Sequence, residues 1–218
     1  KLLEADEQPD GGDEGRDGGL AEERPVHPAL HGEPRHDRGH GGGGEQPVTA
    51  RERAAQAGAR AVLVGHSERR QLFGETDEQT GKKVGAALHA ELLPVLCVGE
   101  TLAQREAGET VAVVTRQLEA ALGALAPDVL GKVTIAYEPV WAIGTGQNAT
   151  PKDAALVHAE IRWWLKQRQA EATRILYGGS VNLKNAAELL AERELDGVLV
   201  GGASLDPAGW AQLVRTAA

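Results

Sequence analysis

Two side chains of this 218-residue chain follow apolar runs and could carry out acid–base chemistry. Glu138 comes directly after the run KVTIAY, where a carboxylate faces a pocket rather than bulk water and could act as a general base toward a carbon acid. His66 follows the run ARAVLV, and Ser67 and Glu68 open the next helix. Because a helix amino end disfavours an imidazolium, we expect His66 to stay neutral and to donate a hydrogen bond. The alternatives are structural: Glu138 could pair with an arginine, and His66 could be a packed core histidine.

Glycine-rich turns follow the last two apolar runs and predict an anion-binding site. Glycine lets the main chain approach a ligand closely, and the helix that follows offers free N–H groups. Two such turns on successive strands favour phosphate binding; the alternative is that the glycines form tight turns and nothing more. The residues concerned are Gly178, Gly179, Ser180, Gly201, Gly202 and Ser204.

The segment after Glu138 is expected to form a lid. Proline stiffens its first end, glycine frees its last, and the apolar centre would be poorly placed in solvent, so closure over a ligand would exclude water. The alternative is an ordinary loop that stays packed on its helix. The lid residues are Pro139, Val140, Trp141, Ala142, Ile143, Gly144, Thr145 and Gly146.

These motifs require strands that end on one face of a sheet. Continuous apolar runs of this length predict strands buried on both faces, as in a parallel sheet. Helical patterns lie between them, so the alternation predicts a parallel α/β fold, either an open doubly wound sheet or a closed barrel. The predicted strands are Ala59–Val64, Leu92–Val98, Lys132–Tyr137, Arg174–Tyr177 and Gly197–Val200.

The predicted helices have apolar stripes and capping signals. The stripe of Glu109–Leu122 consists of Val111, Val114, Leu118 and Leu122. In the following helix, Thr150 suits the N-cap, Pro151 the first position and Asp153 the third. Further along that helix, Leu156, Ala159 and Trp163 recur at helical spacing. Two shorter helices are predicted over Asn182–Glu192 and Pro207–Val214.

Composition narrows the classes of function. There are 23 basic and 32 acidic residues, a formal net charge of −9, which argues against a nucleic-acid binder but leaves room for a small anion in a local pocket. No apolar run is long enough for a membrane span, and no secretory signal is recognisable at the amino end. Cys97 is the single cysteine, which fits a reducing compartment, and we expect a cytoplasmic protein.

Residues 1–50 differ from the rest of the chain. Their glycine, proline and acidic content is typical of low-complexity, disordered sequence. Four histidines in this segment could suggest a metal site, but they lack cysteine partners and any helical or finger spacing, so no metal is expected. These histidines are His27, His31, His36 and His40.

Five motifs occur in a fixed order: VGHSERR, CVGE, AYEPVWAIGTG, LYGGSVN and LVGGASL. Their order and intervals resemble the triosephosphate isomerase family, from about residue 54 to 218. The resemblance implies a single TIM (β/α)8 barrel domain over residues 1–218, in which 54–218 supply units four to eight and the first three units are poorly specified. It also implies a glycolytic and gluconeogenic homodimer in the cytoplasm that needs no metal or organic cofactor and binds neither nucleic acid nor membrane.

The resemblance further implies an aldose–ketose isomerase that interconverts dihydroxyacetone phosphate and D-glyceraldehyde 3-phosphate. Glu138 would move a proton between two substrate carbons, and neutral His66 would polarise the carbonyl and stabilise the enediolate. Glu68 matches a supporting carboxylate, and Cys97 a strand-end cysteine that is not the nucleophile. The matching phosphate contacts are Gly144, Ser180, Gly201 and Gly202.

One element of the family pattern is missing. The family's first strand carries Asn-x-Lys, whose lysine helps to bind the anionic substrate. This chain has no asparagine before Asn148 and no lysine between Lys1 and Lys82. The alternative function is therefore a catalytically impaired family remnant that at most binds phosphate, because losing a positioned cation raises the barrier.

Overall fold

The computed structural model describes residues 56–143 and 149–217. The chain divides into two units, residues 1–45 and 46–218, and all described residues belong to the second. The predicted low-complexity segment 1–50, with its four histidines, therefore lies outside the described residues.

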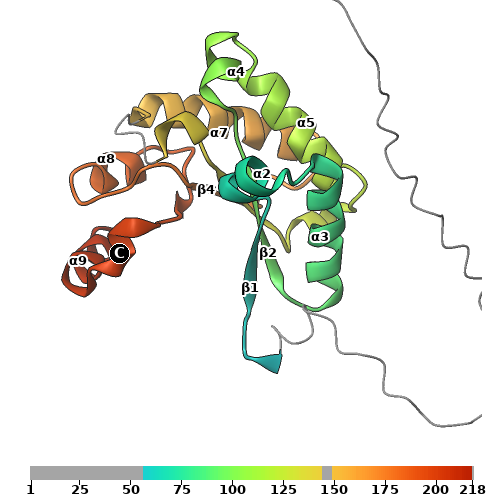
Figure 1. Cartoon of the computed structure of the whole chain (residues 1–218), viewed down its shortest axis with the longest axis horizontal. Helices are drawn as coiled ribbons and strands as arrows, with labels where there is room; N and C mark the ends of the chain where they lie inside the picture. The colour runs from blue at the N-terminus through green and yellow to red at the C-terminus, as the bar shows by residue number, and fades with distance from the viewer. Residues whose placement is uncertain (1–55, 144–148, 218) are drawn as a thin grey trace, which may run out of the picture. The chain divides into compact units, whose positions relative to one another are not determined.

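Five parallel strands form one sheet in the order β1-β2-β3-β4-β5, so each strand pairs with the next along the chain (Figure 1). This confirms the parallel α/β prediction, and sequential parallel strands joined by helices are the arrangement found in a (β/α)8 barrel. Within the described residues the sheet is open, with β1 and β5 at its edges. Its strands are β1 (Ala61–Val64), β2 (Leu93–Val98), β3 (Thr134–Tyr137), β4 (Arg174–Tyr177) and β5 (Gly197–Val198).

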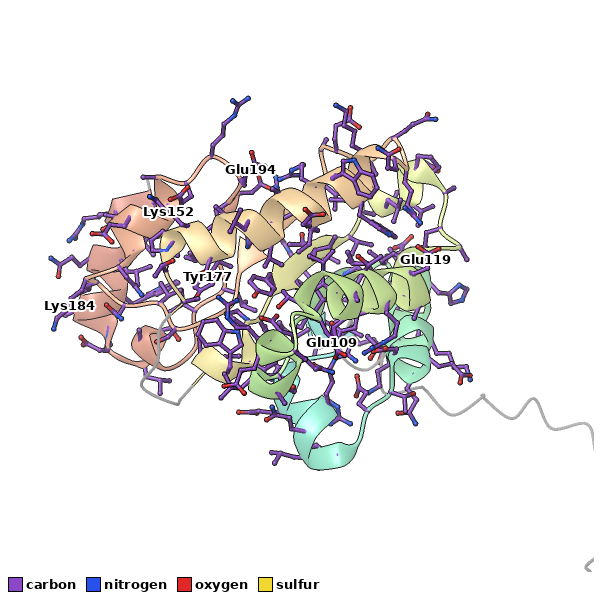
Figure 2. The ribbon with its side chains drawn as sticks, turned by 90° about the horizontal axis from the view of Figure 1, so that it is seen from above. Glu109, Glu119, Lys152, Tyr177, Lys184 and Glu194 are labelled. Carbon is purple, nitrogen blue, oxygen red and sulfur yellow. The ribbon has the colours of Figure 1, made fainter. Side chains whose placement is uncertain are left out.

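Helices follow the strands, and α3, α5 and α7 pack against one another and against the sheet (Figure 1). In the view of Figure 2, charged side chains such as Lys152 and Lys184 point outward, whereas Tyr177 lies inside. The helices are α2 (Ser67–Phe73), α3 (Asp77–His89), α4 (Leu102–Glu106), α5 (Thr110–Leu122), α6 (Pro127–Leu130), α7 (Pro151–Lys166), α8 (Ala186–Leu190) and α9 (Pro207–Ala217), with 3-10 turns η1 (Val140–Ala142) and η2 (Gly202–Leu205).

The start of α7 is as predicted. The Thr150 side chain accepts the Asp153 N–H at 3.1 Å, the Asp153 carboxylate accepts the Thr150 N–H at 3.2 Å, and Pro151 is the first helical residue. This reciprocal cap satisfies two N–H groups that the helix itself leaves unpaired. The short helices differ from their predictions, because α8 is five residues long and α9 extends three residues beyond Val214.

The predicted apolar stripe of α7 is wrong. Leu156 and Trp163 are 70% and 60% exposed, and Ala159 is exposed as well. The helix carries two apolar stripes, and helical spacing alone cannot tell which one faces the sheet. Val111 on α5 is also exposed, although the rest of that stripe is buried. The residues of α7 that are buried are Ala154, Val157, His158, Ile161, Trp164 and Leu165.

The core lies between the sheet and these helices. Val64, Leu96, Ile135 and Ile175 are in register across β1–β4, and each is at most 4% exposed. The opposite face of the sheet is open at β1, where Leu63 is 49% exposed. Along β1, the prediction that strands are buried on both faces therefore holds for one face only. The reason is that, within the described residues, helices cover one side of the sheet.

Candidate active site

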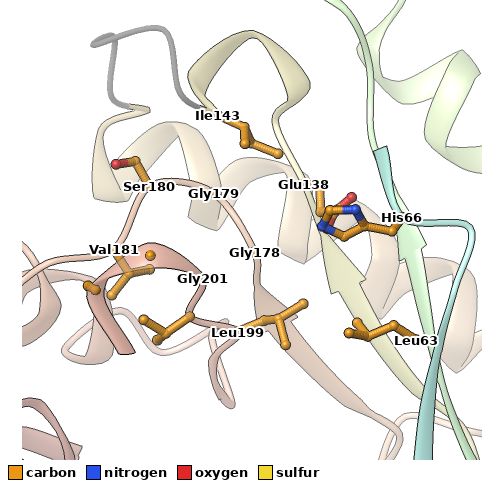
Figure 3. A pocket seen from close by; sticks show the side chains of 13 residues that line it. Leu63, His66, Glu138, Ile143, Gly178, Gly179, Ser180, Val181, Leu199 and Gly201 are labelled. Atoms are coloured by element: carbon orange, nitrogen blue, oxygen red, sulfur yellow. The ribbon is translucent and has the colours of Figure 1, made fainter. Parts of the chain in front are cut away.

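A cavity of about 340 Å³ lies at the carboxyl ends of β1, β3, β4 and β5. Figure 3 shows His66 and Glu138 on one side of it, and Ser180, Val181 and Gly201 on the other. Because the strands are parallel, their carboxyl ends all lie at the same end of the sheet, and the segments that follow them come together there. The cavity is therefore lined by both the predicted acid–base pair and the two predicted glycine turns.

His66 and Glu138 are in direct contact. Nε2 of His66 lies 3.2 Å from Oε1 of Glu138, and the N–H of Ser67 donates to Oε2 at 2.9 Å. The two carboxylate oxygens of Glu138 therefore each bind one of two consecutive residues at the start of α2: Oε1 binds His66 and Oε2 binds Ser67. Glu138 is 2% exposed, whereas a third of the His66 side chain is open to the cavity.

Burial raises the pKa of the Glu138 carboxyl above its ordinary value of 4.5. His66, the Ser67 N–H and the Cys97 thiol favour the ionised form but offset only part of this effect. Burial also raises the pKa of the Cys97 thiol, so Cys97 is a neutral donor beside the carboxylate. The site thus contains a carboxylate with increased proton affinity, which a general base toward a carbon acid needs.

The hydrogen bonds of His66 match a neutral imidazole. His66 is the N-cap of α2, and its Nδ1 accepts the N–H of Glu68 at 3.4 Å. A ring nitrogen that accepts carries no proton, which leaves the proton on Nε2, where it faces Glu138. Glu68 takes part in this cap through its main-chain N–H. Its side chain, whose carboxylate is predicted to support the site, is exposed.

The turn between β1 and α2 depends on Gly65. Its φ is +75°, and a Cβ there would lie 2.8 Å from Cγ2 of Thr80. Arg70 fixes this turn, because its Nε donates to the Gly65 carbonyl at 2.8 Å and its Nη1 to Asp77 at 2.5 Å. Arg116 from α5 binds the other oxygen of Asp77 at 3.0 Å. Two ion pairs and one hydrogen bond to a carbonyl therefore connect α5 to the residue preceding His66.

The described part of the predicted lid is packed on a buried carboxylate. Glu100 is fully buried and accepts the Trp141 indole N–H at 2.9 Å and the Tyr137 hydroxyl at 3.1 Å. Arg105 stacks 4.4 Å from the centre of the Trp141 ring. Within the lid, Val140–Ala142 form η1 and Ile143 lines the cavity, while Gly144, Thr145 and Gly146 lie outside the described residues. Whether the segment closes over a ligand stays a prediction.

The first glycine turn is tight. The sequence predicts that it joins β4 directly to a helix, but in the structure a loop follows it. A Cβ on Gly179 would lie 2.2 Å from the Tyr177 hydroxyl, so only glycine fits there. Five residues separate Ser180 from the start of α8 at Ala186. Asn185 explains this delay, because its side chain binds both the Ser180 carbonyl and the Asn182 N–H, offering the main chain a loop in place of a helix.

The second glycine turn leads directly into η2, which begins at Gly202. Ser204 donates both its N–H, at 2.9 Å, and its hydroxyl, at 2.7 Å, to the Gly201 carbonyl. Gly201 and Gly202 line the cavity opposite Glu138, and a Cβ on either would meet nothing within 4 Å. Internal packing therefore does not require glycine at these two positions.

Sequence patterns missed three groups in or beside this site: the Ser67 N–H, Glu100, and Gln117, whose side chain binds the N–H of Gly99 at 2.8 Å and its carbonyl at 3.2 Å. A main-chain N–H carries no residue-type signal, so the first could not be found. Glu100 was visible as the acid of CVGE, and Gln117 as a polar residue beside Leu118 on the buried stripe of α5. Among the described residues lining the cavity none is lysine or arginine, and the described chain contains no acidic, histidine or cysteine cluster suited to a metal ion.

The family model described as triosephosphate isomerase matches residues 48–217. Curated relatives named triosephosphate isomerase include those of Paracidovorax citrulli, 55% identical over 163 residues, and Azoarcus sp., 52% identical over 161 residues. These alignments cover 74% and 73% of this chain but 64% and 66% of the relatives. The relative from Roseiflexus sp. is 50% identical over 177 residues, with 79% of this chain and 68% of the relative covered. The chain thus spans about two thirds of the length of these relatives.

Proposed function

The chain belongs to the triosephosphate isomerase family, and on this basis we propose that it interconverts dihydroxyacetone phosphate and D-glyceraldehyde 3-phosphate. The observation that carries the proposal is the buried contact between His66 and Glu138, in a cavity that the two glycine turns also line. The proposed reaction moves one proton between adjacent carbons and a second between the two oxygens that these carbons carry, and it needs no redox partner.

Glu138 is the proposed base. It takes the proton from the carbon beside the carbonyl, the electron pair moves to form an enediolate, and the proton returns to the neighbouring carbon. Neutral His66 donates a hydrogen bond from its Nε2–H to the oxygen that gains charge. The proton of the substrate hydroxyl then moves to that oxygen, so that the carbonyl and the hydroxyl exchange places. Because Nε2 and Oε1 are 3.2 Å apart, a substrate that binds both groups must take the place of their hydrogen bond.

The phosphate is proposed to bind across the cavity from this pair. Main-chain N–H groups of Ser180, Gly201 and Gly202 are the described candidates, and Gly144 is the fourth, outside the described residues. Because the described lining contains no cationic side chain, main-chain dipoles carry the recognition in this part of the site.

The test is isomerisation of glyceraldehyde 3-phosphate by the purified full chain in D₂O, followed by NMR. An enediolate route incorporates deuterium at the carbon that exchanges its proton, so the product identifies the mechanism. Glu138→Gln should lower kcat by about 10²–10⁴-fold, because it removes the base. Glu160→Gln, at an exposed glutamate of α7, is the matched control and should keep the rate. Equal rates for wild type and Glu138→Gln would contradict the proposal.

The impaired remnant is a second candidate, and the open sheet edge at Leu63 is the observation in its favour. The two candidates differ in a simple experiment. A folded chain that binds inorganic phosphate in a titration, yet exchanges no deuterium into the triose, would favour the remnant. Measurable isomerisation would exclude it.

We further propose a homodimer in the cytoplasm. Leu72 and Phe73 on α2 are 72% and 70% exposed, and the Arg69 guanidinium lies 4.9 Å from the Phe73 ring centre. Adjacent apolar side chains on α2, the helix that His66 caps, favour contact with a second copy. In sedimentation velocity the wild type should be a dimer and Phe73→Glu a monomer, while Leu156→Glu, at an equally exposed leucine of α7, should stay dimeric. A monomeric wild type would disprove the dimer.

The cytoplasmic location rests on the family's place in glycolysis and on the single cysteine. No helix within residues 56–143 and 149–217 is long and apolar enough to cross a membrane. Fractionation of cells that express the chain tests the location, and recovery in an oxidising compartment would contradict it.

A further inference from the structure

A buried glutamine on α5 binds the strand end beside Glu138. Gln117 is 5% exposed, its Oε1 accepts the Gly99 N–H at 2.8 Å, and its Nε2 donates to the Gly99 carbonyl at 3.2 Å. Both main-chain groups of Gly99 are thus paired with one side chain, much as they would be by a neighbouring strand. Gly99 follows β2 directly, so this amide extends the hydrogen bonding of the sheet by one residue.

Gly99 in turn lies against the main chain of Glu138. A Cβ on Gly99 would be 1.8 Å from the Glu138 carbonyl oxygen, so no other residue fits between them. The preceding residue, Val98, accepts the Glu138 N–H at 2.8 Å. The segment Val98–Gly99 therefore contacts the peptide groups on both sides of the Glu138 Cα.

We propose that Gln117 is a positioning residue for Glu138: it fixes Gly99, and Gly99 fixes the main chain from which the carboxylate projects. Gln117 lines no part of the cavity that holds His66 and Glu138, so its influence is indirect. Its catalytic consequence rests on the proposed isomerase function, whereas its effect on the location of the carboxylate does not.

The neighbouring residue on α5 reaches the other member of the pair. Arg116 binds Asp77, which binds Arg70, which binds the carbonyl of Gly65 just before His66. Consecutive residues of one helix thus connect to both sides of the His66–Glu138 contact. The Arg116 route passes through two further side chains, and Arg116 itself is largely exposed, so the short and buried route through Gln117 is the stiffer one.

The first test is Gln117→Met, which has a similar volume but cannot bind Gly99. We expect kcat to fall by about 10²-fold, the loss that follows from misplacing a catalytic group by roughly 1 Å. KM should stay unchanged, because the glycine turns of β4 and β5 are not altered. Val114→Ala, a core truncation on the same helix, is the matched control: it should lower stability and leave kcat as it is.

The second readout needs no turnover. In protein labelled with ¹³C at the glutamate carboxyl carbons, and with Glu138 assigned from Glu138→Gln, the Glu138 titration should move toward its ordinary range in Gln117→Met and not in Val114→Ala. If the chain isomerises no triose, the proposed function fails while this measurement still tests the position of the carboxylate. If Gln117→Met does not fold, Gln117→Asn decides, because it keeps the amide but is one methylene too short to bind Gly99 at both groups. Wild-type kcat together with a wild-type Glu138 titration in a folded Gln117 variant would overturn the proposal.

Discussion

The amide N–H of Ser67 lies 2.9 Å from Oε2 of Glu138, a residue 71 positions further along the chain. The same peptide segment presents His66 to the other oxygen of that carboxylate at 3.2 Å. The start of α2 thus binds a carboxylate that has lost nearly all contact with water. Such an arrangement favours proton transfer and disfavours stability, since desolvating a charge is unfavourable even when it is hydrogen-bonded.

Replacing Glu138 by glutamine should therefore make the folded chain more stable at neutral pH. Burial raises the pKa of Glu138 above 4.5, so the folded state binds its proton more tightly than the unfolded state does. The contribution of this group to the free energy of unfolding is fully present below pH 4.5 and is lost as pH rises through the raised pKa. In urea denaturation, the difference in free energy of unfolding between Glu138→Gln and wild type should grow as pH rises from 4.5 through the raised pKa of Glu138. A difference independent of pH would contradict this expectation.

His158 should have the opposite pH dependence. It is fully buried, its Nδ1 is 3.2 Å from the Glu194 carbonyl, and burial lowers the pKa of His158 from 6.5 to about 4. The unfolded state therefore binds the proton more tightly, and stability is lost as pH falls from 6.5 toward 4, by up to ~3 kcal/mol. Urea denaturation across this range should show a smaller acid loss in His158→Gln. An unchanged acid loss would mean that His158 does not titrate in this way.

Removing Arg70 should weaken the turn that carries His66. Arg70→Met leaves the buried Gly65 carbonyl without its donor and takes one of two cationic partners from Asp77. We expect the free energy of unfolding to fall by about 2 kcal/mol, as for a largely buried hydrogen bond to a charged group. Arg116→Met is the control, because its ion pair with the same Asp77 is more exposed and should contribute under ~1 kcal/mol. Thermal or urea unfolding measures both, and equal losses would argue against a special role for the Gly65 contact.

Local signals in the sequence were sufficient for much of the fold. Thr150, Pro151 and Asp153 predict the start of α7 because a capping box is complete within four residues. The five apolar runs predict parallel strands because they alternate with helices, and the exposed side chains on α7 show where such patterns fail. Leu156 and Trp163 are as apolar as the residues that the sheet buries, so the choice between the stripes is a matter of packing rather than composition.

Residue types alone indicate the chemistry available at the strand ends: a carboxylate, an imidazole and two glycine turns. Which atoms meet follows from the packing of the chain: Nε2 of His66 and the N–H of Ser67 bind separate oxygens of Glu138, and Gln117 binds Gly99 behind it. The difference lies in the range over which each preference acts. Turn and cap preferences act over a few residues, so particular residue types reveal them. Contacts between main-chain groups tens of residues apart depend on strand register and helix packing. Many different apolar sequences give the same register and packing, so residue types do not reveal these contacts.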